Sequence, residues 1–360
     1  MCANLPFLSH QAGRRRSFAT VRDGSDLSVR AEGRTILALR VAPEAGRLEL
    51  AGLAASAGDG EDPTLAAFAA GIEATLGWYP GRANLRLDLA GRAPERLVAA
   101  LLDEGLAVAD RDGLAVLPAL AMQRPDPWLG ARRAAYPQIH VMSDGRRHPR
   151  RPPKPSGTVY ERFIPSLGRT FGLRTVRPDE DLDRFHRWMN DPHVAAFWNE
   201  AGEREAHRRY LAALIEDPHM LPLIGSFDGE PFAYFEVYWA KENRLGPFYD
   251  AQDYDRGWHV LVGEADFRGR DYIGAWLPSL MHFLFLDDAR TQRIVGEPAA
   301  RHARQIRNLE TSGFARIKTF DFPHKRAALV MLLRERFFDE HLWRPARAAD
   351  VSGHDEAQAL

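Results

Sequence analysis

Two arginines and two glycines lie close together in the C-terminal half of the chain, where they can bind an anion. Arg268 and Arg270 flank Gly269, and Gly274 follows in the segment FRGRDYIGAW. If a helix begins here, its first backbone N–H groups have no helical partners and suit a phosphate or pyrophosphate. Glycines and arginines also open helices that bind no ligand, so the turn alone leaves both interpretations open.

The turn is predicted to lie between a strand and a helix. In the preceding WHVLVGEADF, Val260 and Val262 alternate with His259 and Leu261, which is typical of a strand. In the following YIGAWLPSLMHFLFLDD, apolar residues at helical spacing predict one buried stripe: Ile273, Trp276, Leu277, Leu280 and Leu284. A second strand, RIVGEP, and a second helix ending at SGF come next. This order predicts parallel pairing of the two strands with a right-handed crossover.

Five segments carry a family resemblance: GWHVLVGE, FRGRDYIGAWLPSLMHFLFLDD, TQRIVGEP, LETSGF and DFPHKRAALV. They resemble the acyl-coenzyme A binding core of the GNAT acetyltransferases, and most of all the siderophore-biosynthesis acyltransferases of aerobactin- and alcaligin-type pathways. The resemblance covers about residues 159 to 338. It implies an α/β fold with a mixed sheet, with acetyl-coenzyme A or another short acyl-coenzyme A as co-substrate.

The resemblance also implies roles for individual residues. His259 is expected to be the general base, although a histidine on a strand is more often structural when no such motif surrounds it. Glu297 is expected to orient His259 or to hold the acceptor, and an N-cap-like role for it stays open. The implied cofactor contacts are Val260, Leu261, Val262, Arg268, Gly269, Arg270, Tyr272, Ile273, Gly274, Ala275 and His302. Leu309 stands where many GNAT enzymes have a tyrosine as general acid, so coenzyme A leaves as the thiolate or another group supplies the proton.

The acceptor side is predicted from aromatic and acidic residues. The candidates to line this pocket are Trp198, Tyr234, Glu236 and Trp239. Core packing is the competing interpretation for each aromatic residue. Glu236 or Asp287 can hold the far ammonium group of a diamine-derived acceptor. His324 and Lys325 belong to the segments that carry the resemblance, but it assigns them no role.

Composition limits the class of protein. The chain has 360 residues, 45% of them hydrophobic, which favours two globular domains. The formal net charge of -1 argues against a dedicated nucleic-acid protein. Cys2 is the single cysteine, so a disulfide within the chain is excluded, as suits a cytoplasmic protein. We expect no metal site, because the histidines lack ligand spacing and the one cysteine is isolated. We expect no membrane span, because no apolar run is long enough, and no secretory signal, because no apolar segment follows the N-terminal arginines.

The chain is predicted to contain two domains and a linker. The predicted boundaries are a disordered tail (1–17), an N-terminal α/β domain (18–123), a linker (124–157), a GNAT acyltransferase domain (158–340) and a tail (341–360). The N-terminal domain is either a reduced GNAT-like domain or an unrelated α/β domain. The linker is rich in proline and in basic residues, which favours an extended, solvated spacer over an anion-binding surface.

The leading functional hypothesis is N-acylation of an N-hydroxylated amino acid or diamine to a hydroxamate in siderophore biosynthesis. The alternatives are a GNAT acetyltransferase of an amine drug or aminoglycoside, and a non-catalytic acyl-coenzyme A binding protein of the pathway. The expected partners are a small hydroxylated amine, other pathway enzymes and a second copy of the chain, with no nucleic acid. The residues leave open which acceptor is used and whether the donor is acetyl- or succinyl-coenzyme A.

Overall fold

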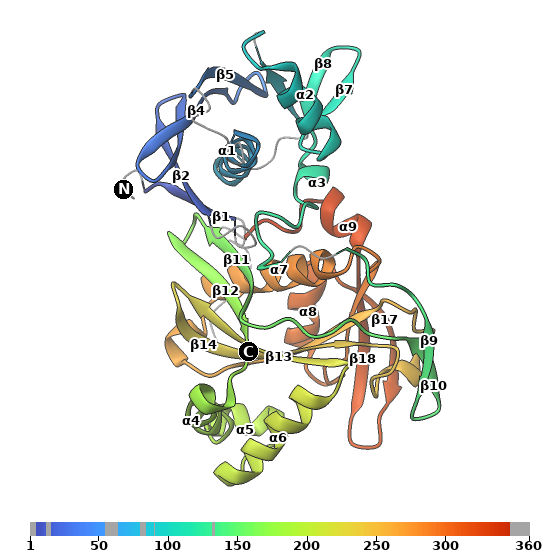
Figure 1. Ribbon diagram of the computed structural model, residues 1–360. Coiled ribbons are helices and arrows are strands. Elements are labelled where there is room, and N and C mark those ends of the chain that lie inside the picture. The colour runs from blue at the N-terminus through green and yellow to red at the C-terminus, as the bar shows by residue number, and fades with distance from the viewer. Residues whose placement is uncertain are drawn as a thin grey trace. The chain divides into compact units, whose positions relative to one another are not determined.

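The computed structural model describes residues 5–11, 16–54, 64–79, 84–89, 91–131 and 134–345, and Figure 1 shows their helices and strands. The chain forms two compact units. The first contains Met1–Arg132 with Glu161–Thr170, and the second contains Arg133–Tyr160 with Phe171–Leu360. Both units combine helices with a mixed sheet, which agrees with the predicted α/β class.

The first unit is built on a sheet with the order β1-β2-β3-β4-β5-β6-β8-β7. Its strands are β1 (Phe7–Gln11), β2 (Arg16–Asp23), β3 (Asp26–Ala31), β4 (Arg34–Ala42), β5 (Arg47–Leu53), β6 (Leu85–Asp88), β7 (Val108–Asp110) and β8 (Gly113–Val116). Its helices are α1 (Thr64–Trp78), α2 (Glu95–Asp103) and α3 (Pro118–Ala121). β5 and β6 are parallel, and the alanine-rich, buried helix α1 makes the crossover that parallel pairing needs.

The second large sheet has the order β11-β12-β13-β14-β15-β16-β18-β17 and lies mainly in the second unit, although most of β11 and the start of β12 fall in Glu161–Thr170 of the first. The small β10-β9 sheet also lies in the second unit. The strands are β9 (His140–Ser143), β10 (Arg146–Pro149), β11 (Thr158–Ile164), β12 (Arg169–Thr175), β13 (Met220–Phe227), β14 (Glu230–Trp239), β15 (Arg256–Val262), β16 (Arg293–Gly296), β17 (Ala315–Asp321) and β18 (Arg326–Leu333). The helices are α4 (Pro178–Met189), α5 (Pro192–Trp198), α6 (Arg204–Glu216), α7 (Arg270–Asp287), α8 (Ala303–Thr311) and α9 (Arg334–Asp339), with short 3-10 turns at Gly246–Phe248 and Ala265–Phe267.

The two large sheets have the same strand order. In each, the fifth and sixth strands form a parallel pair joined by a long helix, α1 in one unit and α7 in the other. One difference is in the connection between the second and third strands. A tight turn joins β2 to β3, whereas α4, α5 and α6 lie between β12 and β13. The shared order supports the hypothesis of a reduced GNAT-like domain over that of an unrelated one.

Several predicted boundaries were wrong. β1 lies inside the predicted disordered tail, because Phe7 is buried against Phe163 and Ala74. The segment AVADRDGLAVLPALAM (107–122) is predicted to be a hairpin, but its end is helix α3. The segment RAALVMLLRERFF (326–338) is predicted to be a strand, but its end is helix α9. Trp343 is buried, so the packed chain continues into the predicted C-terminal tail. The predicted tail residues 1–4, 12–15 and 346–360 lie outside the described residues.

The linker prediction was also wrong for residues 133–157, which belong to the second unit. β9 and β10 pair as a hairpin despite the neighbouring prolines. Arg151 donates from Nε and Nη2 to both oxygens of Glu242, at 2.5 and 2.6 Å. Lys154 Nζ donates to the carbonyl oxygens of Leu214 and Ile215, at 2.8 and 2.6 Å. The basic side chains therefore have protein partners that composition does not reveal.

We expect the Arg151→Ala substitution to destabilise the protein by about 3–5 kcal/mol, because it leaves the Glu242 carboxylate buried without its partner. The Arg151 and Glu242 side chains are only 2% and 5% exposed. Urea unfolding measures the effect. The exposed Arg150 in the same segment is the matched control, and Arg150→Ala is expected to change the free energy of unfolding by less than about 0.5 kcal/mol. Equal small effects of both substitutions would contradict a structural role for the ion pair.

Within the residues that the structure describes, every helix is too short or too polar to cross a bilayer.

Candidate active site

Three side chains from neighbouring strands meet in the sheet of the second unit. Glu236 on β14 lies opposite His259 on β15 in the antiparallel pair, so the two side chains lie on the same face. Glu297 directly follows β16, the parallel neighbour of β15. His259 Nδ1 lies 3.0 Å from Glu236 Oε2, and Nε2 lies 3.0 Å from Glu297 Oε1. We call Glu236, His259 and Glu297 the carboxylate–histidine cluster.

Two tyrosines hold Glu236 in place. The hydroxyl of Tyr210, on α6, donates to Glu236 Oε1 at 2.5 Å, and that of Tyr234 donates to the same oxygen at 3.1 Å. Glu236 itself is 3% exposed. Both carboxylate oxygens are therefore occupied, one by the tyrosines and one by His259. Tyr210 has no sequence signal that links it to Glu236, because 26 residues separate the two.

Glu297 is held by a tyrosine and two cations. The hydroxyl of Tyr238 donates to Glu297 Oε2 at 3.0 Å, and Arg244 Nη2 lies 3.3 Å from Oε1. Lys325 Nζ donates to the backbone oxygen of Glu297 at 2.9 Å. Tyr238 reaches Glu297 across Gly257, where a Cβ atom would lie 2.2 Å from the tyrosine ring. Only glycine leaves room for this contact.

The cluster favours a charged imidazole. Burial opposes protonation of His259, but Glu297 and Glu236 outweigh it and raise the pKa of His259 to about 9. Burial likewise opposes ionisation of Glu297, but His259, Lys325 and Arg244 lower the pKa of its carboxyl well below the ordinary value. At neutral pH His259 is therefore an imidazolium that donates one N–H to each carboxylate, and Arg244 and Lys325 balance the second negative charge.

One edge of β15 is open beside the cluster. Among the described residues, β15 pairs with β16 only at Arg256 and Gly257. The rest of this edge thus lacks a neighbouring strand. The carbonyl oxygen of Val260 on this edge accepts from Trp198 Nε1 at 3.1 Å, and that of Val262 accepts from Arg268 Nε at 2.9 Å. The indole of Trp198 also lies edge-on to His259, with ring centroids 6.3 Å apart.

The basic turn lies at the end of β15, as expected, but its two arginines differ. Arg268 Nη2 donates to the Gly263 carbonyl and to Asp191 Oδ2, both at 3.0 Å, in addition to its contact with Val262. Asp191 also caps the N-terminus of α5. Arg268 thus holds the turn against β15 and α5. Arg270, the first residue of α7, is exposed.

The other predicted cofactor residues are divided between the turn and the interior. Gly269 is the N-cap of α7, and Ile273, Gly274 and Ala275 are in its first two turns. Leu261 is buried on β15. The ring of Tyr272 packs against Phe227 and Phe267, and that of His302 packs against Phe197.

We expect Arg270→Ala to weaken acyl-coenzyme A binding by about five- to tenfold, because it removes a cation from the helix N-terminus that is proposed to bind the pyrophosphate. Titration calorimetry with coenzyme A measures this, and the loss should shrink at high salt. Arg301→Ala, at an exposed arginine of the same unit, is the control. Affinity unchanged by Arg270→Ala would place the pyrophosphate elsewhere.

Two predicted substrate-side residues lie away from the cluster. The Trp239 ring lies beside the Arg151 and Arg256 guanidinium groups, with 4.3 and 4.1 Å between each Cζ and the ring centroid. Asp287 forms an ion pair with the buried Arg256 at 2.7 Å. Leu309, at the position of the missing tyrosine, is buried in α8. In the described residues, His, Cys, Asp and Glu side chains form no group of three suited to a metal ion.

The equivalent positions of the first unit hold leucine. Leu39 and Leu50 are opposite each other on β4 and β5, and Leu89 follows β6. Leu50 and Leu89 each lie two residues after the paired Leu48 and Leu87, as His259 and Glu297 lie two residues after the paired Gly257 and Val295. Leu39 faces Leu50 as Glu236 faces His259. All three leucines are buried. The first unit therefore has no equivalent proton-transfer group at these positions.

The chain is similar to known proteins over part of its length. A family model described as an acetyltransferase (GNAT) domain matches residues 177–322. The N(5)-hydroxyornithine:cis-anhydromevalonyl coenzyme A-N(5)-transacylase of Beauveria bassiana is 51% identical over 195 residues, which are 53% of this chain and 43% of that protein. The N(6)-hydroxylysine O-acetyltransferase of Escherichia coli is 46% identical over 215 residues, which are 59% of this chain and 68% of that protein. A crystal structure of an uncharacterized Bacillus halodurans protein matches 53% of this chain and 96% of that one, with 27% identity and a TM-score of 0.49.

The chain belongs to the GNAT acetyltransferases. Within them it belongs to the group that includes these acyltransferases of hydroxylated amino acids.

Proposed function

We propose that the chain transfers an acyl group from acyl-coenzyme A to the hydroxylamine nitrogen of an N-hydroxylated amino acid or diamine, which gives a hydroxamate. The observation that carries the proposal is the carboxylate–histidine cluster beside the open edge of β15. A strand edge that has no neighbouring strand suits the amide groups of the pantetheine arm. A proton-transfer group beside it suits an acceptor that loses a proton during attack.

The reaction is a direct attack of the acceptor on the thioester carbon. A hydroxylamine nitrogen is largely unprotonated at neutral pH, so it attacks as the neutral nucleophile. The N–H of Val260 lies on the same open edge as its carbonyl and is the proposed donor to the thioester oxygen, on which negative charge develops. The C–N bond forms as the C–S bond breaks, and coenzyme A leaves as the thiolate, whose thiol is fairly acidic.

His259 is the proposed acceptor of the proton that the attacking nitrogen loses. To accept this proton, His259 must first give up the one that Glu236 and Glu297 stabilise. Glu297 is proposed to position the imidazole and to take part in moving its proton. Leu309 offers no proton to the thiolate, so the imidazolium formed in the reaction is the proposed source of that proton.

The test is thiol release from acetyl-coenzyme A with a panel of acceptors. The panel contains N-hydroxylysine, N-hydroxyornithine, N-hydroxycadaverine, their unhydroxylated parents and an aminoglycoside. Turnover with the hydroxylated acceptors alone supports the proposal. Turnover with plain amines or the aminoglycoside would overturn it in favour of an amine acetyltransferase, and coenzyme A binding without turnover of any donor would favour a non-catalytic protein.

Identification of the product shows whether the nitrogen or the oxygen of the acceptor received the acyl group. An N-acylated product is a hydroxamate and forms a coloured ferric complex, whereas an O-acylated product is an ester of the hydroxylamine and does not. We propose the N-acyl product, a cytoplasmic location and cooperation with other siderophore-pathway enzymes.

A further inference from the structure

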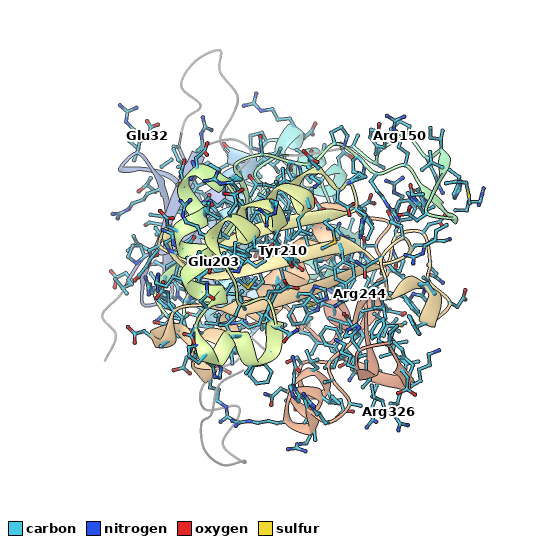
Figure 2. All side chains as sticks on the ribbon, turned by 90° about the horizontal axis from the view of Figure 1, so that it is seen from below. Glu32, Arg150, Glu203, Tyr210, Arg244 and Arg326 are labelled. Atoms are coloured by element: carbon cyan, nitrogen blue, oxygen red, sulfur yellow. The ribbon has the colours of Figure 1, made fainter. Side chains whose placement is uncertain are left out.

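Two cations lie against Glu297, the carboxylate that contacts His259 Nε2. Arg244, in the loop between β14 and β15, contacts Glu297 Oε1, which itself contacts His259. Lys325, in the turn between β17 and β18, lies 4.0 Å from the same oxygen. Figure 2 labels Arg244 together with Tyr210, which contacts the other carboxylate of the cluster.

Arg244 and Lys325 differ in the exposure of their side chains and in the number of N–H groups that already have a protein partner. The Arg244 side chain is 51% exposed, and Glu297 is the carboxylate that it contacts. The Lys325 side chain is 29% exposed, and its Nζ donates to the Glu297 carbonyl. A guanidinium group has five N–H donors in a planar fork, so Arg244 can hold Glu297 and present further donors to a second carboxylate.

The carboxylates of Glu236, Glu297 and Asp287 are already paired. Both oxygens of Glu236 accept hydrogen bonds from protein groups, and Glu297 faces His259, Tyr238 and Arg244. Asp287 is paired with Arg256. The earlier expectation that Glu236 or Asp287 holds the far ammonium group of a diamine therefore loses its support. Arg244 is an exposed cation beside the cluster, and Glu200 is an exposed carboxylate whose charge acts on Tyr210.

We propose that Arg244 binds the α-carboxylate of the acceptor, so that the acceptor is an N-hydroxylated α-amino acid and not the corresponding diamine. This inference rests on the proposed function and names its substrate class. One carboxylate oxygen separates Arg244 Nη2 from His259 Nε2, through contacts of 3.3 and 3.0 Å. A chain of three or four methylene groups, at about 1.5 Å per bond, is long enough to join a nitrogen at His259 to a carboxylate at Arg244.

The position of Arg244 argues against a role in binding the phosphates of coenzyme A. Arg244 precedes β15, whereas the basic turn at Arg268 and Arg270 follows it. Through Glu297, Arg244 lies beside His259, the fourth of the seven residues of β15, whereas the basic turn lies beyond the last residue of that strand.

The test compares two acceptors that differ in the α-carboxylate, N-hydroxylysine and N-hydroxycadaverine. In the unsubstituted enzyme we expect kcat/KM to be at least about thirtyfold higher for N-hydroxylysine, as expected for a charged, bidentate contact. In Arg244→Gln this ratio should fall to within about threefold of unity, and Arg244→Lys should keep part of it. Arg326→Gln is the control, because Arg326 is exposed and its side chain faces Asp321 at 3.8 Å; it should keep the full ratio.

Three outcomes would overturn the inference. In the first, the unsubstituted enzyme uses both acceptors equally. In the second, Arg244→Gln slows both acceptors by the same factor, which would show that Arg244 acts through Glu297. In the third, Arg244→Gln keeps the acceptor ratio but loses a preference for succinyl- over acetyl-coenzyme A, which would assign the carboxylate to the acyl group. If plain amines alone react, the proposed function fails, and lysine with cadaverine tests Arg244 in the same way.

Discussion

Replacement of His259 by glutamine is expected to lower kcat by about a hundredfold or more, because general base catalysis contributes roughly 10²–10⁴. Glutamine keeps a hydrogen-bonding side chain between Glu236 and Glu297 but cannot accept the proton. The glutamine variant therefore tests the proton-transfer role of His259 separately from its role in holding Glu236 and Glu297 in place. Stopped-flow or steady-state thiol release with the preferred acceptor measures the effect.

His259→Ala is the companion variant. It also removes the cation between two buried carboxylates, so we expect it to lower both kcat and the thermal midpoint of unfolding. The Gln variant should lose activity with a smaller loss of stability. If His259→Gln is folded, binds coenzyme A normally and loses less than threefold in kcat, His259 is not the base.

Glu297→Gln is expected to change the pH dependence of the reaction. In the unsubstituted enzyme, Glu297 and Glu236 raise the pKa of His259 to about 9, so kcat/KM should rise with pH up to this range as the imidazolium loses its proton. Removal of the Glu297 charge lowers the pKa of His259 towards its ordinary value. The rising limb should therefore move to lower pH by about one unit or more, while the rate at the plateau falls by about tenfold to a hundredfold.

The pH profiles of kcat/KM for the two proteins test this expectation. Glu310→Gln is the control, because Glu310 is an exposed carboxylate of the same unit, on α8, and its loss should leave the profile unchanged. A profile that does not move in Glu297→Gln would mean that His259 does not control the rising limb. A shift to higher pH would contradict the electrostatic role of Glu297.

Most elements of the second unit were predictable from local patterns. β15, α7, β16 and α8 were predicted in the right order, because alternation and helical spacing of apolar residues are local properties. Errors occurred where burial depended on distant partners. Phe7 forms a strand because it packs on Phe163, and Arg151 is buried because Glu242 is nearby. Neither partner can be read from the residues that surround Phe7 or Arg151.

The sequence predicted which types of residue form the site, but it did not predict which side chains contact one another. His259 and Glu297 were selected from motifs, and the anion-binding turn from its glycines and arginines. The pairing of β14 with β15 brings Glu236 to His259, and the packing of α6 brings Tyr210 to Glu236. Arg268 was expected to bind phosphate, but its contacts with Val262, Gly263 and Asp191 indicate that it holds the turn.

The amino-acid sequence by itself determined the α/β class, the GNAT resemblance and the identity of the central histidine, because these depend on residue types at short spacing. The tertiary structure alone decided the charge state of that histidine, since it depends on carboxylates from two other strands. It also decided which arginine is exposed enough to contact a substrate, because the exposure of Arg244 and the burial of Arg151 follow from the fold around them. Electrostatics acts through space, and separation along the chain does not report the distance between charges.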